Sequence, residues 1–115
     1  MNRSIAFVLG LVMSLVGSAA SAQAVGDPIA GQEKAQTCIA CHGAKGAADN
    51  PEFPILAGQH ADYLLHTLRA YQSGDRVNAI MNGQAADLSE EDMRDLAAFY
   101  SQLEPALHTP DRSRR

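Results

Sequence analysis

The chain has 115 residues and carries 13 acidic side chains against nine basic ones, a formal net charge of −4 at neutral pH. Nucleic-acid binding requires a basic surface, so this balance argues against nucleic acid as a partner. The length allows one small domain with a limited core, and the chain has no Trp and only 5% aromatic residues. Such a core would gain stability from a large bound cofactor.

Residues 1–24 have the three-part layout of a secretory signal peptide, with Arg3 before an apolar segment at 5–16 and small residues after it. The apolar segment has 12 residues, far fewer than the roughly 20 that a membrane-spanning helix needs. We expect cleavage after Ala24, although Ala22 also follows an Ala-x-Ala pattern. The signal predicts export to the bacterial periplasm and a mature chain without a membrane anchor.

Three segments after the signal have the periodicity of amphipathic helices, and none alternates as a strand would, so we predict an all-α domain. The first helix is expected to begin at Asp27, whose carboxylate suits an N-cap, with Pro28 at the first helical position. It is expected to run towards Cys38 and to deliver the cysteines near its C-terminal end.

The second predicted helix runs from about His60 to Gln72, and Gly74 is placed to end it. The third follows Ser89, an N-cap residue with acidic side chains in the next turn, and ends before Pro105. The apolar faces that we expect to form the core consist of Ala61, Leu64, Leu65, Leu68 and Tyr71 in one helix, and of Met93, Leu96, Ala97, Tyr100 and Leu103 in the other.

Two irregular segments separate the predicted helices. The first, residues 43–58, is rich in Gly, Pro and Ala, and a loop of 16 residues in so small a domain is usually functional. The second, residues 73–87, contains Met81, and an irregular backbone there would let the thioether turn inward. Residues 105–115 show no apolar periodicity and are expected to form a flexible tail.

The stretch "TCIACHG" holds the two cysteines of the chain, Cys38 and Cys41, with His42 directly after them. A structural zinc site needs four ligands, and no histidine stands at finger spacing from this pair. A thiol oxidoreductase places such a pair after a strand. A disulfide between cysteines three apart removes little entropy from the unfolded chain. These three interpretations stay open beside a fourth, covalent haem attachment.

Haem attachment accounts for all three residues of the motif together. Two thiols at this spacing can add to the two vinyl groups of one porphyrin, and the histidine that follows can then reach the iron. We therefore expect one haem c, with its iron, bound covalently through Cys38 and Cys41. Secretion agrees with this, because bacteria attach such haems outside the cytoplasm.

The motif, with "FPILAGQHADYLLHTLRAYQSGDR" and "IMNGQAADLSEEDMRDLAAFYSQL", resembles the small class I c-type cytochromes of bacteria. The similarity is greatest to single domains of the periplasmic dihaem cytochromes and to their monohaem relatives. It covers about Gly26 to Leu103 and implies a cytochrome c domain at 25–104, with three main helices and loops around one haem. The chain has one Cys-x-x-Cys-His motif, which departs from the dihaem proteins and indicates a single haem.

The resemblance also implies roles for residues outside the motif. His42 and Met81 would be the two axial ligands of the iron. The carbonyl of Pro54 would accept a hydrogen bond from the His42 ring and fix its orientation. Leu56 would pack on the porphyrin.

Other implied positions concern the fold around the haem. Gly31 and the pair Phe99 and Tyr100 would form the contact between the first and last helices. Arg76 and Asn78 could meet a haem propionate, position the Met81 segment or face the solvent.

The implied function is electron transfer. A haem with His/Met ligation has no vacant position for a substrate and exchanges one electron, so we expect a carrier between a donor and an acceptor protein and not an enzyme. Two other hypotheses are a haem subunit of a periplasmic oxidoreductase complex and a haem domain with an open sixth position for peroxide or gas chemistry.

Overall fold

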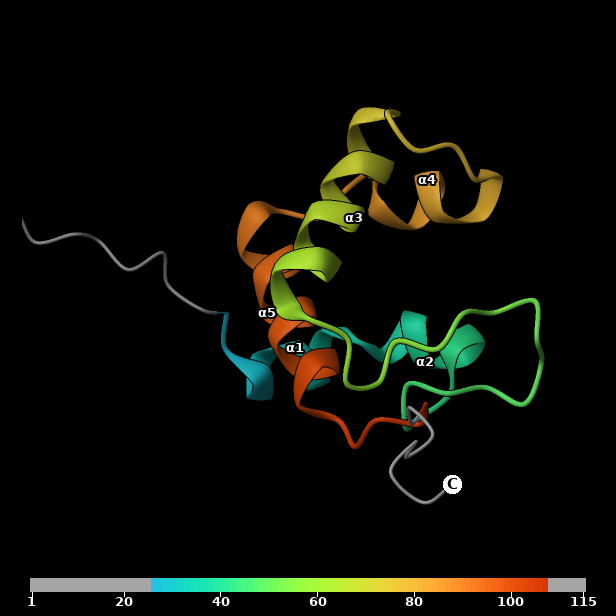
Figure 1. Cartoon of the computed structure of the whole chain (residues 1–115). Helices are drawn as coiled ribbons and strands as arrows, with labels where there is room; N and C mark the ends of the chain where they lie inside the picture. The colour runs from blue at the N-terminus through green and yellow to red at the C-terminus, as the bar shows by residue number, and fades with distance from the viewer. Residues whose placement is uncertain (1–25, 108–115) are drawn as a thin grey trace, which may run out of the picture.

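The computed structural model describes residues 26–107, and these residues contain five helices and no strand (Figure 1). In chain order the helices are α1 (Pro28–Lys34), α2 (Gln36–His42), α3 (Ala61–Ser73), α4 (Ala79–Ala85) and α5 (Glu90–Gln102). The all-α prediction is confirmed. No helix in this part of the chain is long and apolar enough to cross a membrane. The predicted signal peptide and residues 108–115 of the predicted tail lie outside the described residues.

The predicted first helix is in fact two helices, α1 and α2, separated at Ala35. Asp27 caps α1 as expected, because its carboxylate accepts hydrogen bonds from the backbone N–H groups of Ile29 and Ala30. Ala35 has a ψ of 0°, whereas an α-helix has about −42°. Its side chain is fully buried in the core. The prediction of one continuous helix was wrong. Ala favours helices, so nothing in the sequence marks a bend at this position. The bend coincides with the packing of Ala35 in the core.

Helix α1 packs against α5 so closely that one position has no room for a side chain. A Cβ atom at Gly31 would overlap the backbone carbonyl of Asp95 and lie 2.8 Å from the Cβ atom of Phe99. The ring of Phe99 in turn contacts that of Tyr100, with centroids 4.9 Å apart. The contact expected between Gly31 and this aromatic pair is therefore present, and it fixes the start of the segment that carries the cysteines.

An ionic contact also joins α1 to α5. The buried carboxylate of Asp95, 4% exposed, accepts hydrogen bonds from the Asp27 backbone N–H at 2.7 Å and from the Lys34 ammonium at 2.6 Å. Lys34 also lies 2.8 Å from a carboxylate oxygen of Asp92. Hydrogen bonds from Lys34 and Ser89 lower the pKa of Asp92 to about 2, and the Lys34 ammonium likewise lowers the pKa of Asp95.

The core lies where α3 and α5 pack together with the bend between α1 and α2 (Figure 1). Its buried members are Ala35, Leu64, Leu96, Ala97, Phe99 and Tyr100. Helix α3 ends at Gly74, which has a left-handed φ of +84°, and α5 begins with a capping box between Ser89 and Asp92. Both ends agree with the sequence analysis, because caps are determined by residues close in the chain.

Helix α4 lies in the second segment that was predicted to be irregular, and that prediction was wrong. The side chain of Asn78 caps α4 by accepting hydrogen bonds from the N–H groups of Ile80 and Met81, each at 3.0 Å. The Asn82 amide donates to the carbonyls of Tyr71 at 2.6 Å and Arg76 at 2.9 Å. Gly83 inside the helix obscured its periodicity. Met81 is thus presented by a capped helix that is tied to the end of α3.

Candidate haem site

The last turn of α2 brings the motif residues together. Cys38 and Cys41 stand three apart on the helix, a spacing that places both on one face, and both are free thiols. His42 is the last residue of the helix and is 6% exposed. Burial raises the pKa of the Cys38 thiol. A redox-active thiol needs a lowered pKa, so this environment does not support the oxidoreductase interpretation.

The His42 ring is held by the loop that follows it. Its Nδ1 atom lies 2.8 Å from the carbonyl oxygen of Pro54. A carbonyl can only accept, so Nδ1 carries the proton and donates, and the lone pair of the neutral ring is on Nε2. The Phe53 ring lies edge-to-face with the imidazole, and the two ring centroids are 6.3 Å apart. The imidazole is therefore fixed in the tautomer that a metal ligand needs.

The 43–58 loop owes its position to backbone hydrogen bonds. The N–H groups of Leu56 and Ala57 both donate to the carbonyl of Gly46, at 2.8 and 3.1 Å. The N–H of Gly58 donates to the carbonyl of Tyr100 in α5 at 3.0 Å. Leu56 packs against the core and is not among the residues that line the cavity beside His42. The loop is thus anchored on both sides of Pro54.

A cavity of about 380 Å³ opens between α2, the 43–58 loop and α4. Its wall contains predicted site residues and also residues that the sequence analysis did not assign to the site. The complete lining is Thr37, Cys38, Cys41, His42, Glu52, Phe53, Pro54, Tyr71, Asn78, Ile80, Met81 and Gln84. Helices α2 and α4 lie on opposite sides of this part of the fold (Figure 1). The structure therefore brings five of the six predicted site residues to one cavity and leaves Leu56 outside its wall.

Some residues of the cavity wall had a partial signal in the sequence. Tyr71 was assigned to the core face of its helix, and its ring is only partly buried. Phe53 precedes Pro54 directly, so the segment already singled out for Pro54 contains it. Asn78 was one of two residues with open roles, and the structure shows it as the cap of α4. Ile80 and Gln84 were missed because α4 itself was missed.

The donor set of the cavity fits a haem. Two thiols on one helix face can form thioether bonds, an imidazole with a free Nε2 lies next to them, and a thioether approaches from another helix. Phe53, Pro54 and Ile80 add apolar surface for a porphyrin. In contrast, no group of three or more His, Cys, Asp or Glu side chains in residues 26–107 could hold a metal ion, so the zinc interpretation has no support there. Fold and site define a haem-binding protein of the c type.

Comparisons with known proteins agree with this class. The family model for cytochrome c matches residues 29–104. Cytochrome c-554(548) of Halomonas halodenitrificans is 45% identical over 82 residues, covering 69% of this chain and 99% of the relative. The thiosulfate dehydrogenase electron acceptor of Thiomonas intermedia is 45% identical over 75 residues, 64% of this chain and 34% of that protein. The structure of reduced cytochrome c4 from Pseudomonas stutzeri aligns with a TM-score of 0.68 and 36% identity.

The chain belongs to the cytochrome c family. The c4 alignment covers 76% of this chain and 51% of the c4 chain, so the chain spans about half of that protein and nearly the whole of the c-554(548) relative. Membership of the family assigns a haem c, with its iron, attached covalently through Cys38 and Cys41. The resemblance to one domain of a dihaem cytochrome is confirmed, and the protein is an electron-transfer haem protein.

Proposed function

We propose that the protein is a periplasmic monohaem electron carrier whose iron is ligated by His42 and Met81. The observation that carries the proposal is that these two residues border one cavity from different helices, α2 and α4, with the His42 ring held by Pro54. When bound, the haem supplies a one-electron couple of its iron. The chain supplies the two ligands and keeps both in place.

Each ligand has its own support. The hydrogen bond from His42 Nδ1 to Pro54 increases the electron donation of the imidazole and prevents the ring from turning. Asn78 and Asn82 hold the helix that carries Met81. A thioether is a neutral, soft ligand that favours ferrous iron, so this pair of ligands sets a raised reduction potential. An iron that holds both ligands would have no open position for a substrate, which supports a carrier and not an enzyme.

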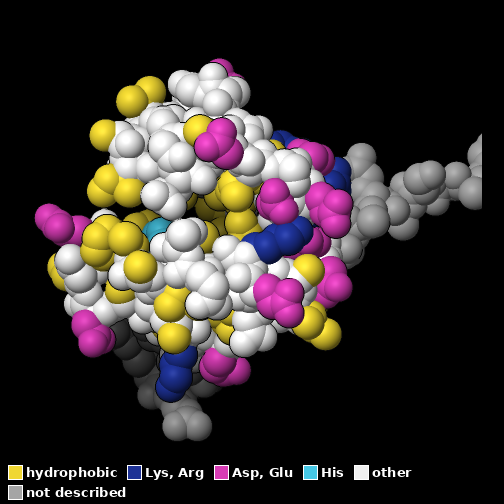
Figure 2. Space-filling model, turned by 180° about the vertical axis from the view of Figure 1, so that it is seen from behind, with side chains coloured by type: hydrophobic (Ala, Val, Ile, Leu, Met, Phe, Trp, Pro, Cys, Tyr) yellow, Lys and Arg dark blue, Asp and Glu magenta, His cyan; other side chains and the backbone are white. Residues whose placement is uncertain are grey.

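The surface beside the cavity suits brief contact with other redox proteins. Val77 and Ile80 are 86% and 56% exposed, and Ile80 borders the cavity. Figure 2 shows apolar side chains gathered on both sides of a hollow in this surface. We infer that donor and acceptor proteins dock here through a small interface, because a carrier must dissociate as readily as it binds. The signal peptide predicted at 1–24 supports a periplasmic location.

A second candidate function is that of a haem subunit in an oxidoreductase complex. The similarity to a thiosulfate dehydrogenase electron acceptor favours it. The two functions differ in the expected stoichiometry. A carrier stays monomeric or self-associates when purified, whereas a subunit copurifies with a larger protein in a fixed ratio.

The ligand assignment is tested by a matched pair of variants of the whole chain, produced with haem. Met81→Leu removes the thioether, and Met93→Leu makes the same change at a methionine that is 2% exposed in α5. We expect the weak red absorption band of the iron–thioether bond in the wild type and in Met93→Leu. Met81→Leu should lose that band and bind carbon monoxide when reduced. A Met81→Leu protein that keeps the band would show that another residue is the sixth ligand.

A further inference from the structure

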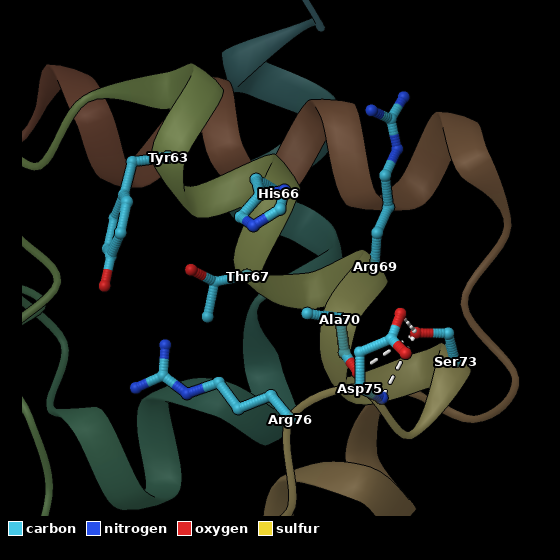
Figure 3. Close-up of a pocket in the computed structure, with 8 residues that line it drawn as sticks. All are labelled: Tyr63, His66, Thr67, Arg69, Ala70, Ser73, Asp75 and Arg76. Carbon is cyan, nitrogen blue, oxygen red and sulfur yellow. Dashed lines mark hydrogen bonds between the residues drawn. The ribbon is translucent and has the colours of Figure 1, made fainter.

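Two buried hydroxyl groups have no hydrogen-bond partner among residues 26–107, those of Thr67 and Tyr100. Thr67 borders a hollow of about 640 Å³ along α3, beside the polar ends of Tyr63 and Arg76 (Figure 3). Tyr100 is 3% exposed and belongs to the core, and it lines neither this hollow nor the haem cavity. A buried hydroxyl without a partner costs free energy, so the surroundings of the Tyr100 hydroxyl require an explanation.

The Tyr100 ring is held from several sides. Its centroid lies 4.9 Å from that of Phe99. A Cβ atom at Gly46 would lie 3.1 Å from the Cδ1 atom of Tyr100, so the backbone of the 43–58 loop lies against the ring. The Tyr100 carbonyl accepts a hydrogen bond from the Gly58 N–H at 3.0 Å. Because the ring is fixed in this way, the hydroxyl cannot swing out to solvent, and only its hydrogen atom is free to turn.

The sulfur of Cys38 is a neighbour of this hydroxyl. Cys38 is half-buried and packs against the core cluster that contains Tyr100. Burial raises the pKa of Tyr100, and the adjacent Cys38 thiol raises it further. Burial also raises the pKa of Cys38, and Tyr100 opposes this larger effect. The two groups are therefore close enough for each to influence the ionisation of the other, although the hydroxyl has no partner in hydrogen-bond geometry.

Haem attachment changes what the Cys38 sulfur can do. A thiol can donate its hydrogen as well as accept one. When the sulfur adds to a vinyl group, the S–H bond breaks, a carbon–sulfur bond forms, and the hydrogen moves to the other vinyl carbon without net oxidation or reduction. The resulting thioether has lone pairs and no hydrogen, so it can only accept. The Tyr100 hydroxyl is then the donor of the pair.

The two cysteines differ in their relation to the core. Both Cys38 and Cys41 line the haem cavity. Cys38 is also among the half-buried residues that pack against the core cluster of α3 and α5, whereas Cys41 is not. Cys38 therefore connects the cavity to the core, and Tyr100 lies on the core side of that connection.

We propose that the Tyr100 hydroxyl donates a hydrogen bond to the thioether sulfur of Cys38 and thereby fixes one of the two haem linkages to α5. Tyr100 is then a positioning residue, because it acts on the haem through Cys38. The bond gives a partner to a hydroxyl that the core otherwise leaves without one. The inference depends on covalent attachment of the haem through Cys38 and is independent of the sixth ligand of the iron.

The first test removes the hydroxyl in three backgrounds of the full chain with haem attached. Tyr100→Phe is made in the wild type, in Cys38→Ala and in Cys41→Ala, and the last two each keep one thioether bond. In the wild type and in Cys41→Ala, we expect Tyr100→Phe to lower the urea midpoint, because it removes a hydrogen bond. In Cys38→Ala the acceptor is already absent, so Tyr100→Phe removes a buried hydroxyl without a partner and should raise the midpoint.

Resonance Raman spectra of the wild type provide a second measurement that needs no substitution. The stretching band of the Cys38 carbon–sulfur bond is identified as the band that Cys38→Ala loses. This band should shift on exchange into D₂O, because deuterium replaces the hydroxyl hydrogen. The shift should disappear in Tyr100→Phe. Tyr63→Phe removes the same atom from a tyrosine that is 49% exposed, and this control should keep the shift.

A Cys38 band that does not respond to exchange in the wild type would overturn the proposal. Equal changes of the urea midpoint in all three backgrounds would also overturn it, because they would indicate a general effect on core packing. If Cys38→Ala holds no haem, the exchange-sensitive carbon–sulfur band decides the question by its loss in Tyr100→Phe and its retention in Tyr63→Phe. The result is separable from the ligand assignment, because Met81→Leu keeps both cysteine linkages.

Discussion

The Nδ1 atom of His42 and the carbonyl oxygen of Pro54 lie 2.8 Å apart although they belong to a helix and to a loop. The hydrogen bond joins residues 12 positions apart and requires the whole Gly-rich turn between them to fold back on α2. Because the Gly46 carbonyl and the end of α5 hold that turn, the orientation of the His42 imidazole depends on the core packing of α5. The proposed ligation of the iron by His42 is thereby coupled to the stability of the fold.

The first prediction concerns this hydrogen bond. Pro54→Ala keeps a carbonyl but frees the backbone that places it, so the bond to His42 should weaken. The imidazole would then donate less charge to ferric iron, and the potential should rise. Proton NMR should show faster solvent exchange of the His42 Nδ1 proton, and voltammetry should show the shift. Pro51→Ala, in the same loop and exposed, serves as the control and should match the wild type in both measurements.

A second prediction concerns the attachment of α4. Asn82→Ala removes the hydrogen bonds to the carbonyls of Tyr71 and Arg76 and to the N–H of Asn78. Because these bonds hold the helix that carries Met81, carbon monoxide should bind faster to the reduced protein, by a factor of about 10 if one net hydrogen bond of roughly 1.4 kcal/mol is lost. Stopped-flow mixing measures the rate. Asn50→Ala, on the 43–58 loop, should bind carbon monoxide as slowly as the wild type, and equal rates in both variants would contradict the role of Asn82.

A third prediction compares two glycines. Gly31→Ala would place a methyl group against the Asp95 carbonyl, so α1 must move away from α5. We expect the free energy of unfolding to fall by about 3 kcal/mol or more, as for overpacked cores. Gly83 lies inside α4, and a Cβ atom added there would have no neighbouring atom within 4 Å. Gly83→Ala should therefore raise the free energy of unfolding by about 0.5 to 1 kcal/mol, because Ala has the higher helix propensity. Guanidinium titrations of both variants check the opposite signs, and a Gly31→Ala protein as stable as the wild type would refute the close contact.

A fourth prediction concerns acid. Salt bridges with Lys34 depress the pKa values of Asp92, to about 2, and of Asp95 in the folded state. A depressed carboxyl pKa contributes stability that is complete above the unfolded value of 3.8 and is lost as the pH falls towards the folded value. The urea midpoint should therefore drop between about pH 5 and pH 2.

Lys34→Met removes the partner of both carboxylates. The variant should have a lower urea midpoint than the wild type at pH 7, because Asp95 would be a buried charge without its ion pair. It should also lose less stability on acidification, since protonation of Asp95 would then relieve that charge. Lys45→Met, at an exposed lysine, is the control. A Lys34→Met protein with the acid dependence of the wild type would show that this cluster does not govern it.

The sequence by itself determined what depends on neighbouring residues. Cys38, Cys41 and His42 are close in the chain, so their spacing, together with the predicted export, favoured a haem. Ser89, Gly74 and Asp27 cap or end their helices through bonds to residues a few positions away, and the helix ends were predicted for that reason. Local hydrogen bonds and periodicity need no knowledge of the rest of the fold.

Tertiary structure decided the features that arise between distant segments. The bend at Ala35 has no Gly or Pro to mark it and coincides with a buried position in the core. Asn82 ties α4 to the end of α3 through backbone carbonyls, which have no sequence signature. Such contacts follow from how helices pack, and packing depends on the whole chain at once.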